Sequence, residues 1–347
     1  MACFGSPSEL KRSLVLIVLV AFLAAPSLNV PKAHAASQSK SHSVKSKKAQ
    51  PRVKHRTKSK PKATHVSHGD ELTLRASAAL VVDQTSGAAL YSKNTDIPSS
   101  IASITKLMTA MVTLDAGLPL EEEIAISEDD VDRVKYTGSR LPVGISLTRE
   151  QLIHLALIAS ENRAAAALSR TYPGGQRAFV TAMNQKASQT GMNDSHFVDG
   201  TGLHSANRST AADLAKMVDA AYRYPLIREI SSTGTYDLEV RRTRVVRVRE
   251  KGKVHKISKT VQRHIAFNNT NRLTRSKDWE IGVSKTGFIN EAGHCLVMQT
   301  EIADHKVIII LLDSIGSWGR IEDAERIREW LERDEGVAAH RSLQTST

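Results

Sequence analysis

Cysteine is nearly absent from this chain, since only Cys3 and Cys295 occur among its 347 residues. Because Cys3 lies in a segment that we expect to be removed, the mature chain cannot form an intrachain disulfide. Aromatic residues make up only 4% of the sequence, which argues against a stacking platform for single-stranded nucleic acid. The composition is otherwise 41% hydrophobic and 24% charged, which excludes collagen, a multi-span membrane protein and a wholly disordered chain.

A long hydrophobic run is also lacking, because the apolar stretch from Leu14 to Ala25 is too short to cross a bilayer as a mature helix. This stretch follows two basic residues and precedes the small-x-small pattern Ala33-His34-Ala35. We therefore predict a cleaved signal peptide over residues 1–35 and an exported protein. A retained N-terminal anchor is the alternative.

Acidic residues are missing between Ala36 and Ser67, a segment that contains ten Lys and Arg residues. The formal net charge of the chain is +12, yet the part from His68 onward is neutral. We expect a basic disordered linker over residues 36–69, because it has almost no large apolar residue to bury. It either holds the protein near an anionic wall or envelope polymer, or is a solvated spacer. Export and a neutral folded part predict no nucleic-acid partner.

The rest of the chain predicts one α+β domain over residues 70–335, followed by a flexible tail over 336–347. Strands are expected at Ala78 to Asp83, Ala88 to Ser92, Ile281 to Gly287, His294 to Ile302 and Val307 to Leu312. Helices are expected at Ser100 to Ala116, Leu152 to Ala159, Ala164 to Ser169, Gln176 to Thr190, Thr210 to Tyr224 and Arg320 to Arg333. The first and last strands should share one antiparallel sheet, with the apolar stripe of the last helix packed on it rather than on a membrane.

Ser103 and Lys106 stand three residues apart at the start of a predicted helix, hence on one helix face. A desolvated lysine that has lost its proton can deprotonate a nearby serine. The spacing alone is weak, because it recurs three more times in the signal and the linker. Only the Ser103 copy lies beside apolar residues that can hold it in place.

Two further motifs strengthen this signal. Ser160-Glu161-Asn162 follows an apolar helix that opens with the capping box Thr148 to Gln151. Lys285-Thr286-Gly287 ends a predicted strand, where the glycine allows a substrate backbone to lie alongside and the lysine adds a cation. Each motif alone is compatible with a purely structural role. All three in this order, on these elements, point to a serine nucleophile.

The three motifs resemble those of the penicillin-recognising serine enzymes, over roughly Leu80 to Leu331. Further stretches are similar to the D-alanyl-D-alanine endopeptidase branch of the low-molecular-mass DD-peptidases, namely Ile101 to Ala110, Ala159 to Ala166, Tyr172 to Gly175 and Lys285 to Val297. The related carboxypeptidases usually have His after Lys-Thr-Gly and a further C-terminal β-domain. Here Phe288 takes that place and the chain ends soon after the last helix, which favours the endopeptidase.

The resemblance implies a β-lactamase/transpeptidase-like fold, with a five-stranded antiparallel sheet flanked by helices and an inserted, mainly helical subdomain. It also implies a periplasmic enzyme that acts on the peptide stems of peptidoglycan, reacts covalently with β-lactam antibiotics and needs no metal or cofactor.

Roles for individual residues follow from the same resemblance. Ser103 is expected to be the nucleophile and Lys106 its general base, kept neutral by desolvation and by the charge of Lys285. Ser160 is expected to relay a proton to the departing amine, and Asn162 to orient Lys106 and the substrate amide.

Substrate binding is expected from the third motif. Lys285 and Thr286 would bind the carboxylate beside the scissile bond, with Gly287 next to the substrate backbone. The backbone amides of Ser103 and Phe288 would form the oxyanion hole.

Other readings stay open at this point. A D-alanyl-D-alanine carboxypeptidase would cut the same type of bond, and a β-lactamase would need a deacylation base such as Glu-x-x-Leu-Asn, which is not found between Asn162 and Lys285. A non-catalytic wall-binding protein would use the basic linker and a basic hairpin predicted over Val240 to Arg263. That hairpin either contacts anionic polymers or is simply solvated. His294 and Cys295 are expected to form a packed core pair.

Overall fold

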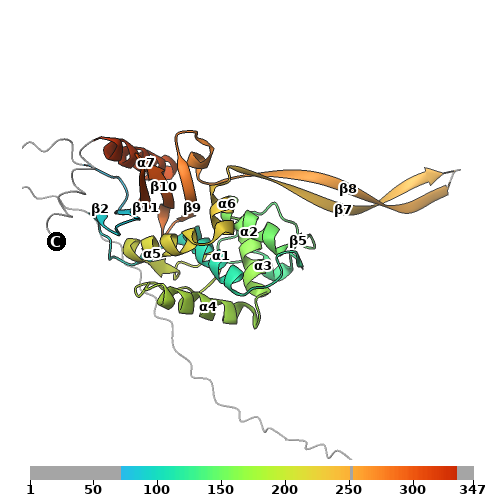
Figure 1. Cartoon of the computed structure of the whole chain (residues 1–347). Coiled ribbons are helices and arrows are strands. Elements are labelled where there is room, and N and C mark those ends of the chain that lie inside the picture. The colour runs from blue at the N-terminus through green and yellow to red at the C-terminus, as the bar shows by residue number, and fades with distance from the viewer. Residues whose placement is uncertain (1–71, 251–252, 334–347) are drawn as a thin grey trace, which may run out of the picture. The chain divides into compact units, whose positions relative to one another are not determined.

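The computed structural model describes residues 72–250 and 253–333 (Figure 1). The signal peptide over 1–35, the linker over 36–69 and the tail over 336–347 lie outside these residues and stay predictions.

The main sheet joins strands from both ends of the described chain. Its strands are β1 (Ala78–Asp83), β2 (Ala89–Lys93), β9 (Glu280–Ile289), β10 (Gly293–Ile302) and β11 (His305–Ser314). They lie in the order β2-β1-β11-β10-β9, and each neighbouring pair is antiparallel. The first strand pairs with the last, from Ala78 opposite Leu312 to Asp83 opposite Val307. The expected five-stranded antiparallel sheet is therefore confirmed.

The segment between β2 and β9 is mainly helical, as expected. Its helices are α1 (Thr105–Asp115), α2 (Arg149–Ile158), α3 (Asn162–Arg170), α4 (Gly175–Gln189), α5 (Ala211–Tyr222) and α6 (Pro225–Ser232). Short 3-10 turns are η1 (Ala102–Ile104), η2 (Glu128–Asp130) and η3 (Arg272–Arg275). Two small sheets pair β3 (Ser99–Ser100) with β6 (Arg208–Ser209), and β4 (Glu123–Ala125) with β5 (Ser146–Thr148). Within the described ranges, no helix has the length and apolarity that crossing a membrane requires.

The two faces of the main sheet enter two separate hydrophobic cores, because successive side chains of a strand point to opposite faces. In β11, Ile309 belongs to the core under α7 (Gly316–Glu332), whereas Ile308 belongs to the core shared with the inserted helices. Ala324 and Ile327 of α7 are fully buried in the first core. Figure 1 shows α7 on one side of the sheet and α1 and α5 on the other. The expected packing of the last helix on the sheet is confirmed.

Two helix boundaries differ from the sequence-based expectation. The helix predicted from Ser100 is divided into η1 and α1, so Ser103 lies in a tight 3-10 turn. The helix expected from Thr210 to Tyr224 ends at Tyr222, and a further helix that was not expected, α6, begins at Pro225. Proline fits the first turn of a helix, because its missing N–H has no partner at that position and its fixed φ is already helical.

A long two-stranded hairpin interrupts the helical segment after α6. It consists of β7 (Thr235–Glu250) and β8 (Lys253–Asn268), which pair without a register shift along their full length. Leu238 and Phe267 at its base are fully buried, whereas Val245 and Ile257 further out are 66% and 46% exposed. The hairpin is therefore attached to the hydrophobic core only at its base.

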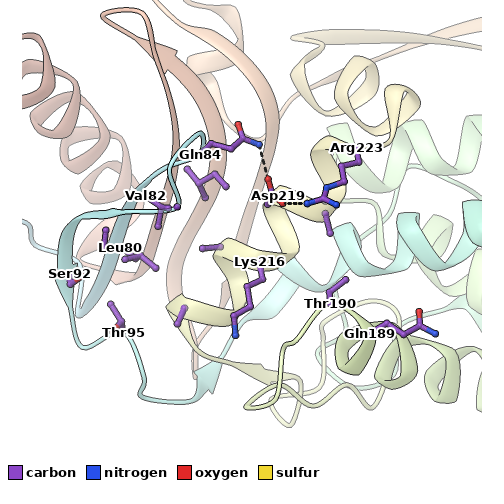
Figure 2. Close-up of a pocket in the computed structure, with 16 residues that line it drawn as sticks. Leu80, Val82, Gln84, Ser92, Thr95, Gln189, Thr190, Lys216, Asp219 and Arg223 are labelled. Atoms are coloured by element: carbon purple, nitrogen blue, oxygen red, sulfur yellow. Dashed lines mark hydrogen bonds and ion pairs between the residues drawn. The ribbon is translucent and has the colours of Figure 1, made fainter. Parts of the chain in front are cut away.

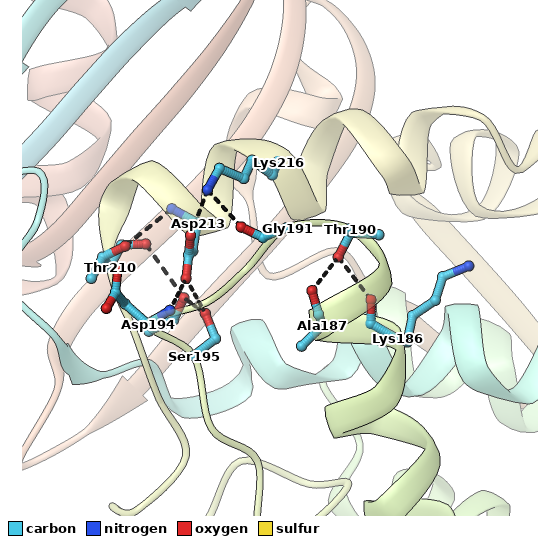
Figure 3. Close-up of polar contacts among 10 residues, drawn as sticks. Lys186, Ala187, Thr190, Gly191, Asp194, Ser195, Thr210, Asp213 and Lys216 are labelled. Carbon is cyan, nitrogen blue, oxygen red and sulfur yellow. Dashed lines mark hydrogen bonds and ion pairs between the residues drawn. The ribbon is translucent and has the colours of Figure 1, made fainter.

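The loop between α4 and α5 is held by one buried carboxylate, as Figure 3 shows. Asp213 Oδ2 accepts hydrogen bonds from the backbone N–H of Asp194 and from the hydroxyl of Ser195, at 2.8 and 2.9 Å. Its other oxygen accepts from Lys216, which also donates to the carbonyl of Gly191. The same loop continues to the backbone segment around Thr201, so this anchor helps to fix the position of that segment.

Candidate active site

Ser103 and Lys106 lie together where η1 meets α1. The preceding residue, Ala102, has a φ of 47°, a strained conformation for a residue with a side chain. Lys106 is fully buried, and its Nζ lies 2.8 Å from Ser103 Oγ. The predicted proximity of hydroxyl and amine is thus present.

Lys106 is held by two further contacts from distant parts of the chain. Its Nζ lies 2.8 Å from Asn162 Oδ1 and 2.6 Å from the carbonyl oxygen of Thr201. Burial lowers the pKa of Lys106 from its ordinary value to about 7, even though Asp199, the strongest of the neighbouring acids, acts in the opposite direction. An amine with such a pKa is substantially neutral at neutral pH and can accept a proton.

The second motif forms the corner between α2 and α3. Ser160 has a φ of 56°, the left-handed conformation that makes the sharp bend, and α3 begins at Asn162. While its carbonyl oxygen meets Lys106, Asn162 donates from Nδ2 to the hydroxyl of Thr137 at 2.8 Å. Thr137 in turn donates to Asp132 at 2.6 Å. This chain of contacts fixes the orientation of the Asn162 amide.

The third motif lies on β9, beside the second. Lys285 is only 1% exposed, and its Nζ donates to Ser160 Oγ at 3.0 Å and to the carbonyl of Thr286 at 2.9 Å. Burial, together with the nearby charges of Lys106 and Arg320, lowers the pKa of Lys285 well below its ordinary value. The charge of Lys106 thus acts on Lys285, whereas the charge of Lys285 is not among the causes that shift the pKa of Lys106, which burial alone lowers.

Gly287 is the last residue of the motif, and β9 continues past it through Phe288 to Ile289, so the motif lies within the strand and not at its end as expected. A Cβ at Gly287 would lie 2.8 Å from the carbonyl oxygen of Ile101, so glycine allows β9 to lie against the turn that contains Ser103. Phe288 is 53% exposed, and its ring stacks on His294 with centroids 4.4 Å apart. Thr286 donates to the hydroxyl of Thr270 at 2.6 Å.

The expectation for His294 and Cys295 is only half right. Cys295 is fully buried, and burial raises the pKa of its thiol to about 11. His294 is partly exposed and stacks on Phe288 instead of packing in the core, because successive residues of β10 point to opposite faces.

Three parts of the site were not predicted from the sequence. The first is the turn at Asp199, whose Oδ1 accepts hydrogen bonds from the backbone amides of Thr201 and Gly202, at 2.6 and 2.7 Å. The second is Thr137 with Asp132, and the third is Thr270. The Asp-Gly-Thr-Gly pattern beginning at Asp199 indicates a turn. Nothing in the local sequence indicates that this turn meets Lys106.

The loop that contains Thr137 also reaches the far side of the site. Lys135 forms an ion pair of 2.5 Å with Glu291, in the turn between β9 and β10. The loop thus contacts both the second motif, through Asn162, and the end of the strand that follows the third motif.

An open groove lies at the base of the hairpin. It has a volume of about 1000 Å³ and is lined by the segment from Ser139 to Thr148, by Arg163 and by Val240 and Arg263. None of the residues of the three motifs lines this groove. The pocket that Asn162 lines is a smaller one of about 650 Å³, which it shares with Asp132, Asp199 and Thr201.

A different pocket, of about 810 Å³, lies between β1, β2 and α5 and is lined by none of the three motifs (Figure 2). Among its lining residues, Asp219 accepts hydrogen bonds from Gln84 at 3.0 Å and from Arg223 at 2.7 Å. The residues of the three motifs lie elsewhere and form the candidate active site.

Comparisons with known proteins agree with this site. Residues 62–316 match the peptidase S11 family, described as D-alanyl-D-alanine carboxypeptidase. A D-alanyl-D-alanine endopeptidase of Pseudomonas aeruginosa is 43% identical over 265 residues, 76% of this chain and 80% of that protein. One from Escherichia coli K12 is 40% identical over 268 residues, with coverages of 75% and 78%.

Among solved structures, the Streptomyces K15 DD-transpeptidase matches with a TM-score of 0.64 at 28% identity, covering 77% of this chain and 98% of that one. The β-lactamase/transpeptidase-like fold expected from the sequence is confirmed.

Proposed function

Because this chain belongs to the D-alanyl-D-alanine carboxypeptidase family and is a serine-type DD-peptidase, we propose that it is an endopeptidase that hydrolyses peptide cross-links of peptidoglycan. Two relatives at 43% and 40% identity have the endopeptidase name, which supports this choice. The exposed Phe288 after Lys-Thr-Gly and the pocket of about 650 Å³ beside Asn162 also favour a substrate with a large group on each side of the bond.

The reaction begins with attack of Ser103 Oγ on the D-alanyl carbonyl carbon. Lys106 accepts the hydroxyl proton as the new C–O bond forms, which its position 2.8 Å from Ser103 Oγ and its pKa of about 7 allow. The observation that supports this assignment most directly is the burial of Lys106, because burial makes the amine a base at neutral pH.

Collapse of the tetrahedral intermediate breaks the C–N bond, and the departing amine takes one proton. Ser160, whose hydroxyl is held by Lys285 at 3.0 Å, passes its proton to the amine and is reprotonated with the proton that Lys106 took from Ser103, so Lys106 is neutral again before deacylation. The acyl-enzyme ester on Ser103 is then hydrolysed by water, which returns the proton to Ser103 and releases the stem with a new carboxylate.

The third motif and backbone N–H groups bind the substrate. Lys285 and Thr286 bind the carboxylate next to the scissile bond, and the arriving negative charge stabilises the protonated form of Lys285. The backbone N–H groups of Ser103 and Phe288 stabilise the oxyanion, a contribution of about 3–4 kcal/mol per donor in serine proteases. Asn162 orients Lys106 and the substrate amide, and Gly287 allows the substrate backbone to approach β9.

The setting of the reaction is the periplasm, reached through the signal peptide over 1–35. The basic linker over 36–69 keeps the enzyme near anionic wall or envelope polymers. β-Lactam antibiotics acylate Ser103 in place of the peptide, and their release is slow, because the sequence between Asn162 and Lys285 has no Glu-x-x-Leu-Asn pattern to supply a deacylation base.

The test is incubation of the protein with a purified cross-linked muropeptide dimer, with products followed by mass spectrometry. Conversion of dimer to monomers that is lost in Ser103→Ala supports the endopeptidase and its nucleophile. An untouched dimer with trimming of pentapeptide stems would instead assign a carboxypeptidase, which cuts the same bond type. If Ser103→Ala retains both activities, Ser103 is not the nucleophile.

A further inference from the structure

The β7–β8 hairpin is a concentrated source of positive charge that the proposed mechanism does not use. Between Arg241 and Arg263 the only acid is Glu250, at the end of β7. Four cations of this segment have described side chains, namely Arg247, Arg249, Lys256 and Arg263. All four are exposed, and none forms an ion pair with another described side chain.

The register of the hairpin places like charges opposite each other. Arg247 pairs directly with Lys256, and Arg244 with Lys259. Like charges at directly opposite positions destabilise an antiparallel pair, and a two-stranded ribbon is at best marginally stable by itself. An anionic partner would relieve this repulsion, so the hairpin is built for contact with negative charge rather than for folding stability.

The exposed cations occur on both faces of the ribbon. Arg247, Arg249 and Lys256 share one face, and Arg263, an odd number of residues from Lys256, lies on the other. Exposed apolar side chains are likewise on both faces, with Val245 on the first. A hairpin that lies on a membrane requires one apolar face, whereas cations on both faces suit a polymer network that surrounds the ribbon.

The base of the hairpin is connected to the active site by the segment that follows β8. Thr270 accepts a hydrogen bond from Thr286 of the third motif at 2.6 Å, and its backbone N–H donates to the carbonyl of Ile158, just before the second motif, at 3.0 Å. The strand segment from Val240 to Arg249 spans about 30 Å at the rise of a β-strand. The hairpin therefore begins at the site and carries its exposed cations outward from it.

We propose that the hairpin is a binding arm for peptidoglycan itself. The arm binds the carboxylates of peptide stems that belong to the same polymer as the cross-link held at Ser103. The proposal rests on the proposed function, since the polymer is chosen because the arm begins at Thr270, beside the site that would cut this polymer. It goes further by assigning recognition of the intact polymer to a region remote from the catalytic residues.

The experiment compares two triple variants of the full chain that lose the same net charge. The test variant is Arg247→Gln with Arg249→Gln and Lys256→Gln. The control is Arg177→Gln with Lys277→Gln and Lys306→Gln, which are exposed and outside the hairpin and the groove. Binding to purified sacculi stripped of attached polymers is measured in the Ser103→Ala background, so that cleavage does not consume the polymer.

We expect the hairpin variant to bind sacculi about tenfold more weakly, because three exposed charge contacts at a few tenths to one kcal/mol each are lost. The control variant should bind like the parent. With Ser103 intact, both triple variants should cleave the soluble muropeptide dimer at the parental kcat/KM, which shows that they are folded and tests the proposed function separately.

Equal binding of sacculi by the hairpin variant and the parent would overturn the proposal. So would a loss confined to lipopolysaccharide micelles or anionic vesicles, because the partner would then be a phosphate-bearing surface. A loss of dimer cleavage in the hairpin variant alone would also contradict it, since the hairpin would then act on catalysis rather than on polymer binding.

Discussion

The active site and the β7–β8 hairpin use the same residue type in opposite surroundings. Lys106 and Lys285 are 0% and 1% exposed, and each contacts groups from at least one distant segment. Lys256 on the hairpin is exposed and lies opposite another cation, Arg247. In the first case burial turns an amine into a base, and in the second exposure leaves a charge available to a partner.

The comparison shows that the two regions depend on different forces. The site depends on non-local packing, because the contacts of Lys106 come from α3 and from the loop before α5. The hairpin depends on pairing between neighbouring strands and on its buried base. Substitutions in the site should therefore change the reaction and the packing around it, whereas substitutions in the outer hairpin should leave both unchanged.

The largest effect is expected from Lys106→Met, which keeps the length of the side chain but removes the base. kcat/KM on the muropeptide dimer should fall by about 10²–10⁴-fold, the usual contribution of a general base. In the parent, the neutral fraction of Lys106 grows with pH, so the rate should rise through pH about 7 and then level off. A pH profile of the variant should lack that rise. If the pH profile of the variant kept the inflection near pH 7, a group other than Lys106 would be responsible for it.

A smaller but global effect is expected from Gly202→Ala. Gly202 has a φ of 79°, and a Cβ there would lie 2.0 Å from the carbonyl oxygen of Ala102, next to the nucleophile. Both the strain and the clash should lower the free energy of unfolding, by about 2–4 kcal/mol, and should slow acylation by labelled penicillin.

The matched control is Gly117→Ala, at φ 60° with no atom within 4 Å of the added Cβ. This variant has the backbone strain without the clash. It should therefore lower the free energy of unfolding by only about 1 kcal/mol and leave acylation by labelled penicillin unchanged. Equal losses in the two variants, measured by urea denaturation, would mean that close contact with Ala102 has no role.

The local elements of the fold could be predicted from the sequence where the signal was itself local. The apolar run before the turn predicted β1 with its bounds at Ala78 and Asp83, and the capping box at Thr148 predicted the start of α2. The order of the three motifs was enough to select the residues that meet in the site, because each motif lies at the end of a recognisable element.

What could not be predicted depends on contacts between distant segments. The carbonyl of Thr201 reaches Lys106 from 95 residues away, and a backbone carbonyl has no sequence signal. Thr137 lies in a loop of irregular structure, so its contact with Asn162 is visible only once the loop is folded. The start of α6 at Pro225 was missed for a different reason, because a proline can follow the end of one helix and also begin the next.

A modest effect is expected from Thr137→Val, which removes the hydroxyl that accepts a hydrogen bond from Asn162. Loss of the two hydrogen bonds of this hydroxyl, from Asn162 and to Asp132, should reduce kcat/KM by about 2–10-fold, with little change in thermal stability. Thr137→Ser keeps the hydroxyl and should restore the rate. If Ser and Val variants behave alike, the methyl group matters and orientation of Asn162 by the hydroxyl does not.

The smallest effect is expected from shortening the hairpin, by replacing residues 243–260 with Asn-Gly so that Arg242 and Val261, which already pair, flank a tight turn. The buried base at Leu238 and Phe267 is kept, so the free energy of unfolding should change by no more than about 0.5 kcal/mol. Leu238→Ala, by contrast, should cost about 2–4 kcal/mol because it opens a cavity in the core. Urea denaturation of both variants separates the two parts of the hairpin. If shortening is as costly as Leu238→Ala, the outer strands stabilise the domain, and the division between a catalytic core and an exposed arm is wrong.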